Sequence, residues 1–167
     1  ASKMGKTFVD ESGNGYDASY STVWLEEKEP VTDYAYAIAV VGDTQIASMY
    51  DVRNGTTIMK DTYKWIADNV ESKKIVQVLG LGDITETSMS PVMDDETATE
   101  RQKEWANAKA SITQLDGKVA YSLVRGNHDV IVDFEANFGS YTPYTSQFDG
   151  FYEGSILNSY RLFTAGG

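Results

Sequence analysis

The sequence contains no cysteine and only one histidine, and these two absences exclude several kinds of site. Without cysteine the chain can form neither a disulfide nor a thiolate zinc site. A single imidazole is also too few for a metal site built mainly from histidines. The lack of cysteine is compatible with either a cytosolic or an exterior location.

Positive charge is scarce as well, because 14 Lys and Arg residues stand against 25 Asp and Glu residues, for a formal net charge of −11. Such a surface does not attract a nucleic-acid backbone or an anionic membrane, so we expect neither as a partner. A phosphate-ester substrate stays open, since bound metal ions can reverse the local sign of charge. No apolar run approaches the ~20 residues of a membrane span, so none is expected.

What is present is the composition of a globular domain, with 41% hydrophobic and 23% charged residues in a chain of 167. This length is enough for one domain with a real core. We expect residues 1–20 to be an N-terminal extension, whether a linker or a cloning remnant, and residues 21–167 to be the domain. The start at Ala1 and the Tyr-, Gly- and Ser-rich composition slightly favour an exported bacterial protein.

Three apolar runs share one pattern and predict buried strands. They cover residues 36–45, 74–83 and 118–129, and each ends in a glycine and a short polar cluster. Near-continuous Val, Ile, Leu and Ala predicts strands that are covered on both faces, as in a parallel sheet.

Two helices are predicted between these strands. Residues 56–71 and 97–115 place apolar side chains at helical spacing. Asp94 or Asp95 is positioned to cap the second helix, and Gly117 stands where a C-terminal glycine is expected. The order strand, helix, strand, helix, strand indicates two right-handed βαβ units of an α/β fold.

Three further segments flank this core. Residues 21–31 predict an extra edge strand, residues 134–155 a long ordered loop, and residues 157–165 a fourth strand. The loop is rich in tyrosine and phenylalanine. These rings could wall a substrate pocket, but we favour the simpler interpretation that they cover an apolar edge and fill the core.

Metal-capable side chains follow all three central strands. In chain order they are Asp43 and Gln45, then Asp83 and Glu86, then Asn127, His128 and Asp129. In open α/β sheets the carboxyl ends of the strands converge, so these side chains are expected to lie together. Carboxylate and amide oxygens suit Mn, Mg or Ca, and a histidine adds affinity for Zn or Fe. Each cluster alone is more often a turn, but three in the same topological place favour a functional site.

The blocks VVGDTQ, GLGDITE and RGNHD resemble the first three signature blocks of the calcineurin-like metallophosphoesterases. In that family Asp-x-His, Gly-Asp and Gly-Asn-His-Asp/Glu each follow a strand of a βαβαβ unit. The resemblance covers residues 37–129. It implies the βαβαβ half of a β-sandwich flanked by helices. It also implies hydrolysis of phosphate mono- or diesters by a metal-bound hydroxide.

The resemblance further implies a role for each matching residue. Asp43 would bind the first of two divalent ions (Mn, Fe, Zn or Mg), Asp83 would bridge both ions, and Asn127 would bind the second. His128 would face the substrate phosphate and protonate the leaving oxygen. Asp129 would orient and charge that imidazole.

Two departures from the family pattern bear on activity. Gln45 stands where the family has a metal-binding histidine, and a neutral amide is a harder and weaker ligand that favours Mn- or Mg-like ions. The family's later histidine-containing blocks are absent, because His128 is the only histidine. We therefore expect the N-terminal portion of a longer phosphoesterase, with little or no activity of its own.

Two alternatives stay open. The first is a catalytically impaired binding module on the same fold. The second is a nucleotide-binding α/β domain, which is disfavoured because no Gly-x-Gly-x-x-Gly or Walker loop follows the first strand. A half-sandwich would also expose an apolar face, which predicts self-association.

Overall fold

The computed structural model describes residues 5–8, 18–21, 33–90 and 94–166. The chain divides into two compact units, Ala1–Tyr34 and Ala35–Gly167. In the first unit, β1 (Gly5–Phe8) and β2 (Ala18–Ser21) form an antiparallel hairpin. Residues 22–31 of the predicted edge strand lie outside the described residues.

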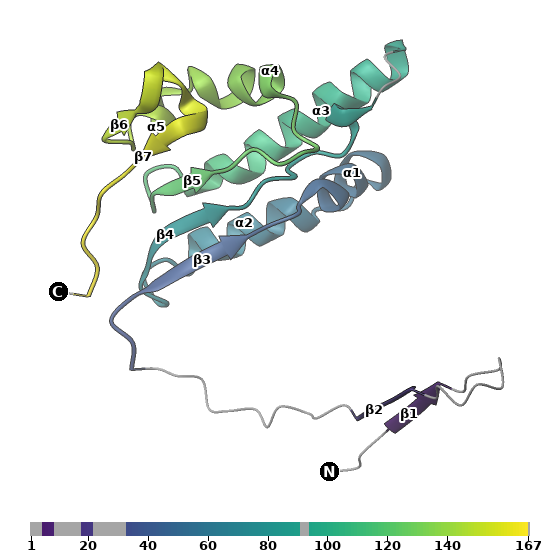
Figure 1. Cartoon of the computed structure of the whole chain (residues 1–167), viewed down its shortest axis with the longest axis horizontal. Helices are drawn as coiled ribbons and strands as arrows, with labels where there is room; N and C mark the ends of the chain where they lie inside the picture. Colours follow the sequence, from purple (N-terminus) through teal and green to yellow (C-terminus); the bar gives the residue numbers. More distant parts are fainter. Residues whose placement is uncertain (1–4, 9–17, 22–32, 91–93, 167) are drawn as a thin grey trace. The chain divides into compact units, whose positions relative to one another are not determined.

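The second unit is built on a three-stranded parallel sheet with the order β3-β4-β5 (Figure 1). Its strands are β3 (Ala37–Val41), β4 (Ile75–Gly80) and β5 (Tyr121–Leu123). All three lie within the apolar runs, and both pairings are parallel, so the predicted α/β architecture is confirmed.

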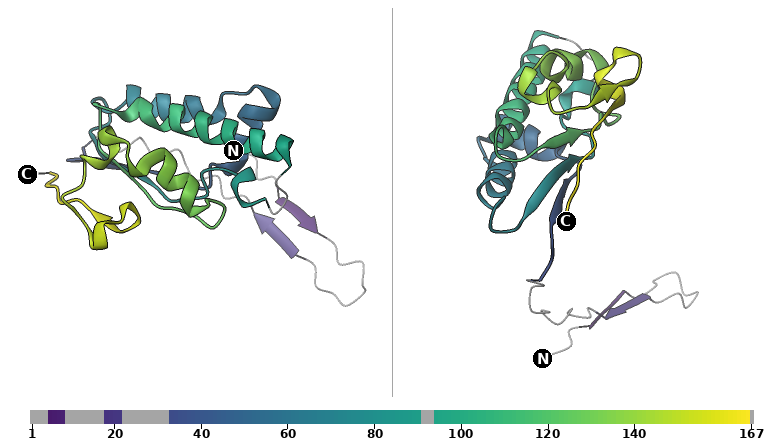
Figure 2. Two further views of the ribbon diagram at one scale, coloured as in Figure 1. Left: turned by 90° about the horizontal axis from the view of Figure 1, so that it is seen from above. Right: turned by 90° about the vertical axis from the view of Figure 1, so that its left-hand side faces the viewer.

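Three helices pack side by side against one face of this sheet (Figures 1 and 2). They are α1 (Gln45–Asn54), α2 (Ile58–Asp68) and α3 (Asp95–Ile112). The two predicted helices are confirmed as α2 and α3, and Asp94 caps α3 by accepting the Thr97 amide at 2.8 Å. Helix α1 escaped prediction because it carries no apolar stripe.

The core lies between the helices and the sheet. Its members are apolar side chains from α2, α3, β4 and β5, including Met59, Ile66, Val78, Trp105, Ile112 and Tyr121. Burying a large apolar side chain contributes about 1.5–3 kcal/mol, so this layer supplies the main stabilisation of the unit. No helix among the described residues is long and apolar enough to cross a membrane.

The opposite face of the sheet is only partly covered, which corrects the prediction of strands buried on both sides. On β3, Ile38 is 41% and Val40 is 59% exposed within the described part of the chain. Beside Ile38 on the same face, β4 places the buried Gln77, which donates to the Ser122 hydroxyl and accepts from Arg161 at 2.6 Å. Self-association through the open part of this face stays a prediction.

The segment after β5 is more regular than the predicted loop. It contains α4 (Ile131–Phe134), the π-helix η3 (Glu135–Gly139) and α5 (Thr142–Thr145). Tyr144 of α5 stacks on Tyr121 with ring centroids 5.2 Å apart, and its hydroxyl accepts the Leu123 amide at 3.0 Å. These contacts close the outer edge of β5, so the core-filling interpretation holds for Tyr144.

The predicted fourth strand is largely absent from the structure. Only β7 (Ser159–Tyr160) forms, and it pairs antiparallel with β6 (Gly150–Phe151) rather than joining the parallel sheet. Short 3-10 turns complete the described elements: η1 (Thr87–Met89), η2 (Thr113–Leu115), η4 (Tyr152–Gly154) and η5 (Ile156–Asn158).

Candidate functional site at the carboxyl edge of the sheet

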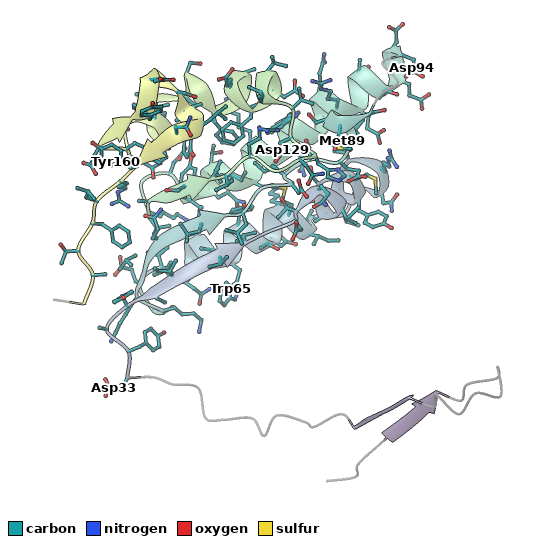
Figure 3. The ribbon with its side chains drawn as sticks, viewed as in Figure 1. Asp33, Trp65, Met89, Asp94, Asp129 and Tyr160 are labelled. Atoms are coloured by element: carbon teal, nitrogen blue, oxygen red, sulfur yellow. The ribbon has the colours of Figure 1, made fainter. Side chains whose placement is uncertain are left out.

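The three polar clusters meet where the parallel strands end. The Asp43 amide donates to the Gly82 carbonyl at 3.3 Å, which joins the ends of β3 and β4. The His128 amide donates to Asp83 Oδ1 at 3.0 Å, which joins the ends of β4 and β5. Figure 3 marks this edge by the labelled side chains of Met89 and Asp129. The structure thus brings together the three blocks that the sequence singled out.

Asp43 and Asp83 both adopt a left-handed backbone conformation, with φ values of 54° and 49°. Non-glycine residues rarely take positive φ, and such strain costs on the order of 1 kcal/mol or more. It persists where surrounding contacts over-determine it, and it clusters at functional sites. Its occurrence at the same point of two adjacent strands supports a site at this edge.

Glycine is required at two positions between the strand ends. A Cβ on Gly82, whose φ is +94°, would lie 2.5 Å from the backbone nitrogen of Gly126. A Cβ on Gly126 would lie 2.1 Å from Asp83 Oδ1. These glycines let the ends of β4 and β5 touch, so that the Asp83 carboxylate reaches the backbone of the third block.

Asp129 does not orient the imidazole, which corrects the role expected for it. Its side chain is fully buried, and its carboxylate accepts the amides of Ile84 at 2.9 Å, Thr85 at 3.1 Å and Gly126 at 3.0 Å. Burial raises the pKa of Asp129, although these same amides pull it down. Asp129 therefore fixes the loop after β4 to the turn that carries His128.

The acidic group that faces His128 is Glu86. Its Oε2 lies 3.1 Å from His128 Nδ1, and the imidazole side chain is 25% exposed. The two atoms are not aligned for a hydrogen bond, and Nδ1 has no hydrogen-bond partner. The contact is consequently an ion pair when the imidazole is protonated. The sequence had placed Glu86 only among the metal-capable side chains; its position three residues after Asp83 was the available signal.

A second buried carboxylate, on Glu104 of α3, holds the backbone of Glu86. Glu104 is fully buried, and its Oε2 accepts the amides of Glu86 and Thr87, each at 2.9 Å. The Thr87 hydroxyl donates to its other oxygen. The sequence did not indicate this role, because a glutamate among many charged helical residues usually lies on the surface.

A third carboxylate completes this support. Asp133 of α4 accepts the Ser88 hydroxyl at 2.6 Å and pairs with Arg101 of α3. Together with Asp129 and Glu104, it binds every residue from 84 to 88 through a backbone amide or a side-chain hydroxyl. We call these three carboxylates the acidic brace. The Arg125 guanidinium adds to it by donating to the Asp129 carbonyl at 2.7 Å.

Gln45 occupies the same edge in a different way. With its amide nitrogen facing the backbone, it donates to the carbonyls of Asp83 at 3.0 Å and Asp43 at 2.9 Å. In this geometry Gln45 ties the ends of β3 and β4 together. Its role as a metal ligand stays a prediction.

The remaining donors at this edge are oxygens that suit a hard divalent cation. Within the described residues, the Asp43 carboxylate has no hydrogen-bond partner. From the same residues, the Asp83 carboxylate accepts a hydrogen bond at Oδ1 alone, from the His128 amide. Asn127 contacts Met89 Sδ through its amide nitrogen at 3.9 Å, which leaves its oxygen unused there. No three His, Asp or Glu side chains in the described ranges form a metal-holding group. The donors therefore fit the oxygen-rich part of a metal centre and not a complete two-metal set.

A cavity of about 350 Å³ opens directly beside the imidazole. Its walls include Arg53, Glu86, Met89, Thr97, Glu100 and His128. The cavity brings Arg53 of α1 and His128 of the third block together with the loop after β4 and the first turns of α3.

The sequence model of the family described as calcineurin-like phosphoesterase matches residues 36–167, which include the parallel sheet and every residue of the edge described above. A search of curated proteins found no match.

Proposed function

Because the chain belongs to the calcineurin-like phosphoesterase family, we propose that its strand-end site hydrolyses phosphate mono- or diesters with the help of divalent cations. The observation that carries the proposal is the meeting of the three blocks at one edge, where His128 opens into a cavity.

The chain's own residues divide into a metal-holding group and an acid–base group. Asp43, Asp83 and Asn127 would hold the cation through their side-chain oxygens. When bound, the cation would lower the pKa of water and neutralise charge on the phosphate. The positive φ of both aspartates supports this assignment, because strain of this kind is retained where a function needs it.

His128 would act as the general acid that protonates the leaving oxygen. Its Nδ1 is buried beside Glu86, so the other ring nitrogen is the one available to a substrate. The Glu86 carboxylate, 3.1 Å from Nδ1, would orient the imidazole for proton transfer to the leaving oxygen. Asp129 and Glu104 would act through Glu86 and the turn, as positioning residues.

A second candidate is a binding module on the same fold that has lost catalysis. Gln45 favours it, because this residue replaces the imidazole ligand of the family and is used as a backbone tie. Metal titration by calorimetry discriminates between the two. Tight binding of two cations per chain would contradict an impaired module.

The test is hydrolysis of nitrophenyl phosphate with added Mn²⁺, with the 167-residue chain and any longer natural polypeptide that carries it. We expect Asp83→Ala to lower kcat/KM by at least about 100-fold, since it removes a ligand and the link to the His128 amide. Glu71→Ala, an exposed carboxylate before β4, should leave the rate unchanged. Full activity in Asp83→Ala would overturn the proposal.

A further inference from the structure

We propose that the cavity beside His128 is a subsite for the leaving group, and that it accepts a small, uncharged group rich in hydroxyls, such as a sugar or another polyol. This inference rests on the proposed function and extends it to the class of substrate. We call the cavity the leaving-group subsite.

The position of the cavity follows from the reaction. His128 donates its proton to the oxygen that departs, so the departing group must lie on the side of the imidazole that the solvent or a ligand can reach. The cavity lies on that side, because His128 is one of the residues that line it. Its volume of about 350 Å³ lies at the lower end of small-molecule sites, which limits the group to roughly the size of a monosaccharide.

Part of the lining is an ion pair between Arg53 and Glu100, which presents free hydrogen-bond donors. Arg53 of α1 donates through Nε and Nη2 to the two carboxylate oxygens of Glu100 on α3, with the Nη2–Oε2 distance at 3.0 Å. Its Nη1 makes no hydrogen bond to the described part of the chain, and the Arg53 side chain is 48% exposed. A guanidinium has five N–H donors in a fixed plane, so the unused edge is available to a ligand oxygen.

The charge at this wall argues for a neutral ligand. The pKa of Glu100 is lowered by its hydrogen bond from Arg53, so the pair is fully ionised and mutually neutralised at neutral pH. The remaining ionisable carboxylate at the subsite is Glu86, and the whole chain has a net charge of −11. A leaving group with further negative charge, such as an acidic peptide, is therefore disfavoured.

The subsite also has an apolar side. Met89 is 52% exposed there, and its sulfur lies 3.9 Å from the Asn127 amide nitrogen. The thioether is thus held over the third block, where the C–H face of a sugar ring could pack against it while the hydroxyls reach Arg53. A polarizable, unbranched side chain adapts to such irregular surfaces.

The experiment compares two substrates on matched variants of the full chain. Kinetics with a hexose phosphate and with nitrophenyl phosphate are measured for the native chain, Arg53→Met and Lys64→Met. Lys64 has a similarly exposed ion pair on α2, away from the site, and serves as the control. We expect Arg53→Met to lower kcat/KM for the hexose phosphate about tenfold more than for nitrophenyl phosphate, since it removes donors that only hydroxyls use.

Each outcome is informative. An equal loss on both substrates, or no loss on either, would overturn the subsite, as would faster turnover of an acidic phosphopeptide than of the hexose phosphate. If neither the native chain nor a longer natural polypeptide that carries it hydrolyses either ester, the proposed function fails, and the subsite is then tested by binding alone. Because the chain has one histidine, the Hε1 proton of its ring can be followed by NMR as a single imidazole signal. A shift of that signal by hexose phosphate that Arg53→Met abolishes supports the subsite, and no shift overturns it.

Discussion

The three strand ends of the site are supported in two different ways. The ends of β4 and β5 are joined through buried carboxylates, and residues Ile84, Thr85, Thr87 and Ser88 are all buried. The end of β3 is exposed at Gly42 and Asp43, and it is tied to β4 by backbone contacts and the Gln45 amide. We call the joined ends of β4 and β5, which carry the proposed acid–base pair Glu86 and His128, the rigid side. The end of β3, which carries the proposed metal ligand Asp43, is the adaptable side.

This difference matches the roles proposed for the residues on each side. A general acid works only within hydrogen-bond reach of the leaving oxygen, so Glu86 and His128 need a loop that does not move. A metal ligand can rely on the cation to complete its coordination, so Asp43 needs less support from the protein. The carboxylates of the acidic brace accept two amides or more, or a hydroxyl and an arginine, which offsets the cost of burying their charge.

The largest effect is expected from Glu104→Met, which removes the central carboxylate of the acidic brace while keeping the side-chain length. The amides of Glu86 and Thr87 would lose their acceptor, at about 1–3 kcal/mol for each backbone group left unsatisfied. We expect a lower free energy of unfolding in denaturant, a shifted His128 imidazole signal and reduced turnover.

Two further variants isolate the cause. Glu104→Gln keeps one oxygen for the amides and a nitrogen for the Thr87 hydroxyl, so it should restore most of the imidazole signal. Glu96→Met, exposed on the same helix, controls for the loss of one charge. If Glu104→Met leaves the imidazole signal in its native position, the brace does not position Glu86.

A smaller effect is expected from Gln45→His on the adaptable side. An imidazole has fewer donors than the amide, so one of the two carbonyl contacts is lost, at about 1 kcal/mol of stability without metal. Zinc affinity should rise, because imidazole is a better zinc ligand than a neutral amide. Unfolding without metal and zinc titration calorimetry measure the two changes. Unchanged zinc affinity would show that position 45 does not face the cation.

The sequence predicted the rigid and the adaptable sides unequally well. The strands were recognisable because three apolar runs end in glycine and polar residues, and this also located Asp43, Asp83 and Asn127. The acidic brace was hidden, because Glu104 follows Glu86 by 18 residues and only the packing of α3 brings them together. Asp129 was misread because adjacency to His128 suggested contact, whereas the turn directs its carboxylate towards the loop after β4.

Helix α1 was also missed from the sequence, because polar contacts and not apolar ones hold it in place. Its buried positions are Ser48 and Asp51, and its large apolar residues Ile46 and Tyr50 are exposed, so hydrophobic periodicity cannot reveal it. What holds α1 is polar contact. Asp51 accepts the amides of Ile58 and Met59, at 2.7 and 3.0 Å, and the Thr56 hydroxyl. The β3 side therefore has a carboxylate of its own, but it fixes α1 to α2 and not the strand end.

The last predicted effect, which vanishes in acid, tests that assignment through pH. Burial pushes the pKa of Asp51 upwards, but hydrogen bonds from Thr56, Ile58, Met59 and Asn107 outweigh it, so the pKa in the folded chain is lowered. The stabilisation by Asp51 is then fully present above the unfolded-state pKa of about 3.9 and is lost as pH falls through the folded value.

Asp51→Asn should lower the free energy of unfolding by about 1 kcal/mol at pH 7, as for loss of a helix cap, and by progressively less in acid. Denaturant unfolding of both proteins between pH 7 and pH 2 measures this difference. If the two proteins differ in unfolding free energy by the same amount at every pH, Asp51 acts through its shape and not through its charge. Asp51 would then differ from the carboxylates of the acidic brace in how it packs.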